Sequence, residues 1–151
     1  MANTFVVGYD GSNAAKEALN AAIGLAESRQ GSKIIITCGH DRRPGWLGYE
    51  PLWQAAMELE KAWDHMEEKI NDDLEEAAKT VRAAGIEAAT ACSRGNPASI
   101  VVAVARDVGA DMIVVGTKGA GGSETTTVLG STTQELLHTA HVPVLVVPAK
   151  G

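Results

Sequence analysis

The stretch Val114-Val115-Gly116-Thr117-Lys118-Gly119-Ala120-Gly121-Gly122-Ser123 decides how the rest of the chain is interpreted. It reads as a buried strand that runs into a glycine-rich loop, and Gly130-Ser131-Thr132-Thr133 then opens a helix. Glycine allows a backbone to approach a ligand closely, and a helix N-terminus presents unpaired N–H groups to an anion. The candidate phosphate contacts are Gly116, Gly119, Gly130 and the Ser131 hydroxyl.

A flexible surface loop followed by an ordinary serine cap is an equally good interpretation of this glycine spacing, because glycine patterns are common. The sequence contains no GxxxxGK[ST] and no GxGxxG, so neither a Walker-type site nor a dinucleotide fingerprint is supported. Lys118 would add a positive charge to a phosphate site.

On both sides of this stretch, apolar runs alternate with segments of helical periodicity. The runs are continuous, which is typical of strands covered on both faces. They cover 5–9, 33–38, 86–92, 111–116 and 143–147. The first helical segment has Ser12 as its N-cap and ends at Gly31, and the second begins near Gln54 and ends at Gly85. The third has Asn96 as its N-cap and Pro97 as its first residue and ends at Gly109, and the fourth covers 132–139. The pattern predicts an α/β fold, a doubly wound five-stranded parallel sheet of order 3-2-1-4-5 with helices on both faces.

In such a sheet, ligands bind beyond the carboxyl ends of the strands where the strand order reverses. The first strand ends at Tyr9-Asp10 and the fourth ends at Gly116, so we expect Asp10 and the glycine loop to meet in one cleft. The Asp10 carboxylate can accept hydrogen bonds from a ribose or an adenine amine. Formation of a turn with Gly11 is an alternative role for the same residue.

Composition narrows the class of protein. The chain has 151 residues, 45% of them hydrophobic, and we expect a single domain over 1–151. A net charge of −6 and scattered basic residues argue against a nucleic-acid partner. The N-terminus has no signal-like segment, and no window is apolar enough for a membrane span, so we expect a cytoplasmic protein that does not bind membranes.

Few residues suggest catalysis or metal binding. No GxSxG is present, and the pairs Cys38/His40 and His138/His141 are too sparse for a metal site, so we expect no catalytic residues and no metal held by side chains. Thr125–Thr127 could accept a phosphoryl group or be solvated loop residues. The segment 42–53, with prolines, glycines and tryptophans, could be a lid.

Taken together, the motifs resemble the universal stress protein family over nearly the whole chain. The residues that carry the likeness are Val7 to Ser12, Gly95 to Ala98, Gly109 to Gly119, Gly130-Ser131 and Pro143 to Val147. The nucleotide-binding branch has Gly, two residues, Gly, nine residues, then Gly and Ser or Thr. Here Gly116 and Gly119 match, but ten residues precede Gly130-Ser131.

The resemblance implies an ATP-binding site. Asp10 and the backbone at Gly8 and Gly39 would hold the adenine and ribose, with Mg²⁺ held mainly by the phosphates. The residues that would follow the ribose and phosphates are Val115, Gly116, Gly119, Gly130, Ser131 and Thr132. The resemblance also implies a homodimer that pairs the last strand, Val144 to Val147, across a two-fold axis.

We therefore expect an ATP-binding universal stress protein that acts as a nucleotide-dependent regulatory switch with at most slow hydrolysis. Two alternatives use the same fold: a nucleotide-free dimeric interaction module and a cyclic-AMP-binding variant of the site. A weak ATPase or an autophosphorylating enzyme is a third, although the sequence displays no activated phosphoryl acceptor.

Overall fold

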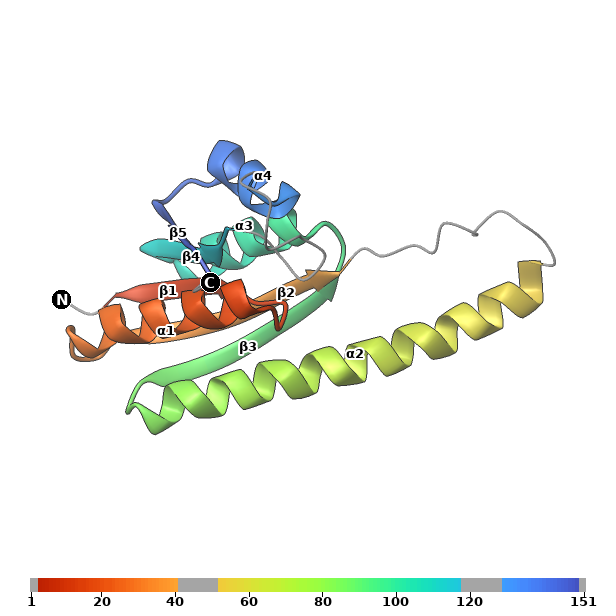
Figure 1. The fold of residues 1–151 in the computed structure, drawn as a ribbon, viewed down its shortest axis with the longest axis horizontal. Coiled ribbons are helices and arrows are strands. Elements are labelled where there is room, and N and C mark those ends of the chain that lie inside the picture. Colours follow the sequence, from red (N-terminus) through yellow and green to blue (C-terminus); the bar gives the residue numbers. More distant parts are fainter. Residues whose placement is uncertain (1–2, 41–51, 118–128, 150–151) are drawn as a thin grey trace.

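The computed structural model describes residues 3–40, 52–117 and 129–149. Its centre is a five-stranded sheet in the order β3-β2-β1-β4-β5, in which every pair of neighbouring strands is parallel (Figure 1). The strands are β1 (Thr4–Gly8), β2 (Lys33–His40), β3 (Glu87–Arg94), β4 (Met112–Gly116) and β5 (Val144–Val147). The predicted fold class and strand order are confirmed.

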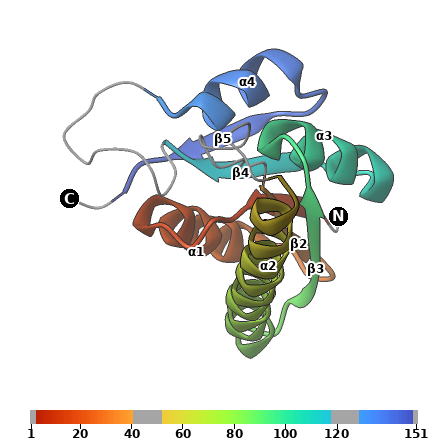
Figure 2. The same cartoon turned by 90° about the vertical axis from the view of Figure 1, so that its right-hand side faces the viewer.

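Helices cover both faces of the sheet. They are α1 (Asn13–Glu27), α2 (Leu52–Ala83), α3 (Pro97–Val108) and α4 (Ser131–Thr139). Figure 2 shows α1 and α2 on one side of the sheet and α3 and α4 on the other. This arrangement follows from parallel pairing, because each crossover must return the chain over one face of the sheet.

The core consists of two apolar clusters, one under each helical layer, because successive residues of a strand point to opposite faces. On β1, Phe5 and Val7 pack with α1 and α2, whereas Val6 packs with α3 and α4. On β4, Val114 belongs to the first cluster and Val115 to the second. Both faces of the central strands are buried, as the continuous apolar runs predict.

Local signals set the helix ends. The Ser12 hydroxyl accepts a hydrogen bond from the N–H of Ala15, and the Asn96 side chain accepts one from Ser99, so both predicted N-caps are confirmed. At the other end of α3, Gly109 adopts the left-handed conformation, with φ of 64°. The helix α1 ends at Glu27 rather than at Gly31, because Ser28 already serves as its C-cap.

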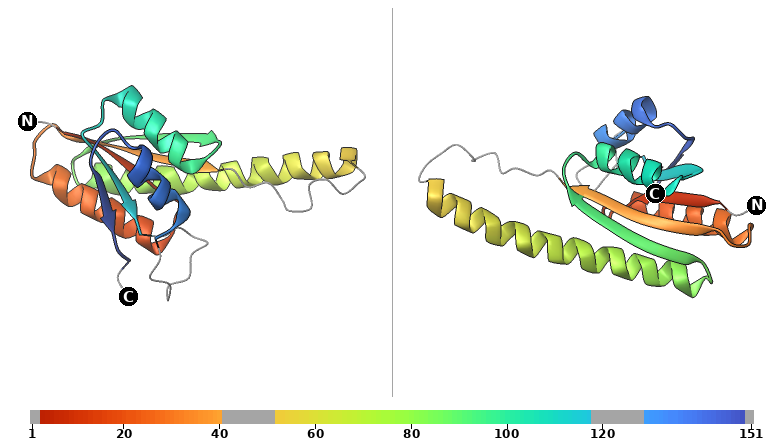
Figure 3. Two further views of the ribbon diagram at one scale, coloured as in Figure 1. Left: turned by 90° about the horizontal axis from the view of Figure 1, so that it is seen from above. Right: turned by 180° about the vertical axis from the view of Figure 1, so that it is seen from behind.

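The strands β2 and β3 extend beyond their predicted ends at 38 and 92. β2 continues to His40 and β3 to Arg94, with these two residues in register. The helix α2 buries Leu74 and Val81 near its C-terminal end. Its N-terminal half projects past the end of the sheet in both views of Figure 3.

Candidate functional site

The end of β1 forms a tight turn in front of α1. The N–H of Tyr9 donates to the carbonyl of Thr37 at 2.9 Å, which ties the end of β1 to β2. The Asp10 carboxylate accepts from the N–H of Ser12 at 2.9 Å, and Gly11 follows with a φ of 81°. Asp10 is exposed at this turn. The turn role predicted for Asp10 is therefore present, and it fixes one carboxylate oxygen at the carboxyl end of the sheet.

The surroundings of Tyr9 are acidic. Burial raises the pKa of the Tyr9 phenol, and the carboxylates of Asp73, Glu76 and Asp10 raise it further. The phenol therefore stays neutral at ordinary pH. A negative potential at this end of the sheet disfavours phosphate groups near Tyr9 and allows neutral, hydrogen-bonding parts of a ligand.

Two of the predicted site glycines are required by helix packing. A Cβ on Gly116 would lie 2.6 Å from the Cβ of Ala14 and 2.8 Å from its carbonyl carbon, because α1 lies directly on the end of β4. A Cβ on Gly39 would lie 2.8 Å from the Cα of Pro97, at the start of α3. From the sequence, Gly116 is predicted to be glycine so that a phosphate can approach the backbone. In the structure, close packing against a helix explains the absence of a side chain at both Gly116 and Gly39.

Hydrogen bonds close the base of the glycine loop. The N–H of Gly130 donates to the carbonyl of Thr117 at 2.8 Å, so the chain returns beside the point where it leaves β4. The Thr133 hydroxyl, on a side chain of a residue only 4% exposed, donates to the carbonyl of Gly116 at 2.8 Å. These contacts, which we call the loop neck (Gly116, Thr117, Gly130 and Thr133), hold the N-terminus of α4 against the end of β4.

The N-terminus of α4 has no side-chain cap. Gly130 occupies the N-cap position, and Ser131 is the first residue of the helix. The alternative in which Ser131 acts as an ordinary N-cap is therefore wrong, because a glycine takes that position. The exposed Ser131 hydroxyl and the first-turn N–H groups lie together at the positive end of the helix dipole.

The structure brings most of the predicted site residues to one edge of the sheet. Gly8 ends β1, Gly39 is the penultimate residue of β2, and Val115 and Gly116 end β4. A Cβ on Gly8 would lie 3.0 Å from a methyl group of Val115, so these two strand ends are in contact. The N-terminus of α4 provides Gly130, Ser131 and Thr132. The expected positions Lys118, Gly119, Thr125–Thr127 and 42–51 lie outside the described residues.

Sequence reasoning missed two threonines near this edge. Thr133 closes the loop neck, and its only sequence signal is its place in the Ser-Thr-Thr run after Gly130. Thr37, which is 0% exposed and pairs with Gly8, has a hydroxyl without a hydrogen-bond partner among the described residues. Nothing in a β-branched run distinguishes such a threonine from its neighbours.

Other features of the described residues bear on metals and membranes. Across 3–40, 52–117 and 129–149, no group of three or more His, Cys, Asp or Glu side chains is placed to hold a metal ion. Within the same ranges, no helix is long and apolar enough to cross a membrane.

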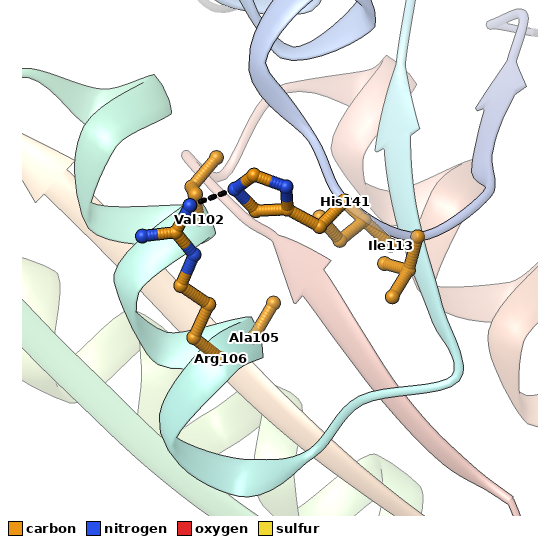
Figure 4. Close-up of a pocket in the computed structure, with 6 residues that line it drawn as sticks. Val102, Ala105, Arg106, Ile113 and His141 are labelled. Atoms are coloured by element: carbon orange, nitrogen blue, oxygen red, sulfur yellow. Dashed lines mark hydrogen bonds between the residues drawn. The ribbon is translucent and has the colours of Figure 1, made fainter.

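A small pocket of about 40 Å³ lies away from the loop neck, near the beginning of β4 (Figure 4). It is lined mainly by apolar side chains of α3, β4 and the α4–β5 connection, and Arg106 contacts the ring of His141 at its rim. The pocket is too small for a nucleotide, since ligand pockets usually measure several hundred Å³.

This sheet order, with an uncapped helix N-terminus at the end of β4, defines a doubly wound α/β protein. In that class of protein, ligands bind beyond the carboxyl ends of the strands where the strand order reverses. The family model of the universal stress protein family matches residues 1–148. The chain belongs to the universal stress protein family.

Individual proteins are similar to this chain over nearly its whole length. The universal stress protein in the QAH/OAS sulfhydrylase 3′ region of Thermus aquaticus is 32% identical over 97% of this chain and 99% of its own. The structure of MJ0577 superposes with a TM-score of 0.82 at 22% identity, covering 100% of this chain and 99% of that one. A universal stress protein solved in complex with cAMP has a TM-score of 0.67 at 25% identity, covering 99% and 98%.

Proposed function

We propose that this protein binds an adenine nucleotide, with ATP as the principal ligand, at the carboxyl edge of its sheet. The observation that carries the proposal is the loop neck, which holds an uncapped helix N-terminus at the end of β4, the strand that pairs with β1. The related structure in complex with cAMP supports an adenine nucleotide as the ligand class.

The charges at this edge orient the ligand. The acidic surroundings of Tyr9 and Asp10 suit the adenine and ribose, with Gly8 and Gly39 contributing backbone groups. The N-terminus of α4, some distance along the same edge, suits the phosphates. In this orientation Val115 and Gly116 follow the ribose, and the phosphates meet Gly119, Gly130, Ser131 and Thr132.

A magnesium ion in this site would be held mainly by the nucleotide. The described residues offer no cluster of metal-ligating side chains, whereas Mg²⁺ readily binds phosphate oxygens and retained waters. When bound, the ion would neutralise phosphate charge. The protein's own contribution is the set of N–H donors at Ser131 and Thr132 and the oriented carboxylate of Asp10.

We infer a regulatory role in the cytoplasm, in which bound nucleotide biases the conformation of the glycine loop and thereby the choice of partner. No catalytic residue is assigned, and hydrolysis would be slow at most. A homodimer through β5 completes the proposal, because this short strand is an edge of the sheet and its residues are only half-buried.

Calorimetric titration with ATP and Mg²⁺ tests the proposal. Asp10→Ala removes a charged acceptor and Gly119→Val adds a side chain beside the expected phosphates, so each variant should weaken ATP binding by roughly tenfold or more. Gly24→Ala is a matched control on the exposed side of α1, where a Cβ meets no atom within 4 Å. Unchanged affinity in both site variants, with the fold intact, would refute the proposed site.

Cyclic AMP is a second candidate ligand, because the related complex contains it. Titrating cAMP into ATP-loaded protein compares the two ligands. Displacement of ATP at comparable cAMP concentrations would show that the site accepts both nucleotides. A nucleotide-free interaction module predicts no binding of either ligand and no nucleotide released from the purified protein, which mass spectrometry can measure. Incubation with γ-labelled ATP tests autophosphorylation of Thr125–Thr127, and absence of label excludes it.

A further inference from the structure

The two cysteines of the chain lie opposite each other on neighbouring strands. Cys38 on β2 and Cys92 on β3 are partners in the register of the parallel pair. They share one face of the sheet, since Cys38 belongs to the cluster under α1 and α2 and Cys92 packs against that cluster. Neighbouring strands run about 4.8 Å apart, which lies within the Cα separation of roughly 4.4–6.8 Å that a disulfide spans.

Both side chains are free thiols in this structure. Burial, and then the neighbouring Cys92, raise the pKa of Cys38 to about 12. Burial and the Glu67 carboxylate raise the pKa of Cys92. Both groups are therefore protonated and slow to react at neutral pH.

The two thiols differ in access. Cys38 is 9% exposed, and its Sγ lies 3.8 Å from the carbonyl oxygen of Gly39. Cys92 is half-buried on β3, which is an edge strand with a neighbour on one side only. An oxidant therefore reaches Cys92 first, and β3 can adjust its position without disturbing a second strand.

We propose that Cys38 and Cys92 form an oxidation site, in which a hydroperoxide converts the thiol pair to a disulfide across β2 and β3. The small fraction of Cys92 that is ionised attacks hydrogen peroxide, and the O–O bond breaks. Cys92 becomes a sulfenic acid, and the hydroxide released takes up the former thiol proton and leaves as water. The Cys38 sulfur then attacks the Cys92 sulfur. The S–O bond breaks, the oxygen leaves as a second water with the Cys38 proton, and hydrogen peroxide has accepted both electrons.

The new disulfide would close a covalent loop that contains the whole of α2. The chain between the two cysteines contains α2, whose N-terminal half projects beyond the sheet (Figure 1). Closing a long loop removes conformational entropy from the unfolded chain. Oxidation should therefore stabilise the β2–β3 edge and raise the melting temperature by roughly 5–10 °C.

The test treats the full-length folded protein with hydrogen peroxide, alkylates the remaining thiols after denaturation, and measures intact mass and linked peptides. We expect loss of the two thiol hydrogens, a peptide pair joining Cys38 to Cys92, and reversal by dithiothreitol. Thiols that both remain alkylatable, or Cys92 that proceeds to a sulfinic acid while Cys38 stays reduced, would overturn the proposal.

Two single variants check the order of the steps. Cys38→Ala should leave Cys92 as a sulfenic acid that dimedone traps, and Cys92→Ser should leave Cys38 unmodified under the same exposure. Circular dichroism confirms that each variant is folded. Oxidation of Cys38 in the Cys92→Ser variant at the wild-type rate would show that Cys92 is not the entry point and would overturn the assigned sequence.

Discussion

Two buried threonines at the carboxyl edge of the sheet differ in the hydrogen bonding of their hydroxyl groups. The Thr133 hydroxyl is bonded to the carbonyl of Gly116, whereas the Thr37 hydroxyl has no partner among the described residues. A buried hydrogen bond contributes roughly 1 kcal/mol, and a buried hydroxyl without a partner costs about 1–3 kcal/mol. The same substitution, threonine to the isosteric valine, should therefore have opposite effects at the two positions.

Thr133→Val should lower the free energy of unfolding by about 1–2 kcal/mol and weaken ATP binding, because it opens the loop neck. Thr37→Val should raise the free energy of unfolding by about 1 kcal/mol. Urea denaturation measures both changes. Thr139→Val is a control, since Thr139 is exposed and its hydroxyl donates to the carbonyl of Glu135 within α4. Equal effects of the three substitutions would contradict the role assigned to Thr133.

The Cys38 thiol makes stability depend on alkaline pH. Its pKa is raised from 9.0 to about 12 in the folded protein, by burial first and then by Cys92, Asp10 and Asp73. The folded state therefore holds the proton more tightly, so the contribution is complete below about pH 9 and is lost as the pH rises toward about 12.

We expect the free energy of unfolding to fall by up to ~1.4 kcal/mol per pH unit above about pH 9 because of this group. Cys38→Ala should reduce the slope of unfolding free energy against pH. Part of the slope should remain in this variant, because the pKa of Cys92 is also raised. Reducing conditions keep both thiols free during the urea titrations. A slope that is unchanged in Cys38→Ala would mean that other groups dominate the alkaline titration.

At the scale of elements, the docking of α1 on β4 depends on the absence of a side chain at Gly116. Gly116→Ala would place a methyl group 2.6 Å from the Cβ of Ala14 and 2.8 Å from its carbonyl carbon, both part of a helix start fixed by the Ser12 cap. Overpacking of this kind costs about 1–3 kcal/mol. Because β4 leads directly into the loop neck, ATP affinity should fall as well.

Gly24→Ala is the matched control within the same helix. Nothing lies within 4 Å of a Cβ at this position, and alanine favours the helix over glycine, so the variant should gain about 0.5–1 kcal/mol. Thermal and urea denaturation compare the two variants directly. If both Gly116→Ala and Gly24→Ala destabilise the protein, then α1 tolerates no added side chain, contrary to the opposite effects expected for the two variants.

Much of this element arrangement could be predicted from the sequence. Ser12, Asn96-Pro97 and Gly109 are local signals whose physical effect does not depend on distant residues, and each lies at the helix end that it predicts. The continuous apolar runs predict buried parallel strands for the same reason. Right-handed crossovers reduce the possible strand orders to a few, and the observed order is one of them.

The rest depends on contacts between distant residues. β2 extends through Gly39 and His40 because β3 pairs with it there, although no apolar pattern marks those positions. The sequence pattern indicates Gly116 as a phosphate contact, and the family resemblance implies a ligand role for Gly39. Only the packed helices reveal the steric reason for glycine at both positions. The bond from Thr133 to Gly116 likewise requires α4 and β4 to meet first. The ligand residues themselves stay a prediction.

For the whole molecule, the register of β5 predicts how a dimer can be broken without unfolding. The carbonyl of Pro143 accepts a hydrogen bond from the N–H of Ile113 in β4, and that of Val147 accepts one from Thr117, just after β4. The alternate residues Val144 and Val146 therefore direct their backbone groups to the open edge. Val146→Pro removes an outward N–H and leaves the bonds to β4 in place.

If β5 forms the dimer interface, Val146→Pro should give a folded monomer, with the mass measured by analytical ultracentrifugation and the fold by circular dichroism. Leu145→Pro is the contrasting variant, because it removes an N–H directed toward β4 and should destabilise the subunit. A Val146→Pro protein that remains a dimer would place the interface elsewhere.

The length of α2 has a kinetic consequence. Among the side chains of α2 that the structure describes, the buried ones lie toward its C-terminal end and are Leu74, Ala77, Ala78 and Val81. Glu60, Lys61 and Asp64, farther toward the N-terminal end, are exposed. Helical hydrogen bonds without tertiary cover open at low free energy. Amide exchange with deuterium should therefore be fastest at the projecting end of α2 and become progressively slower toward Val81. Exchange would occur through local fraying at the projecting end and through global unfolding near Val81.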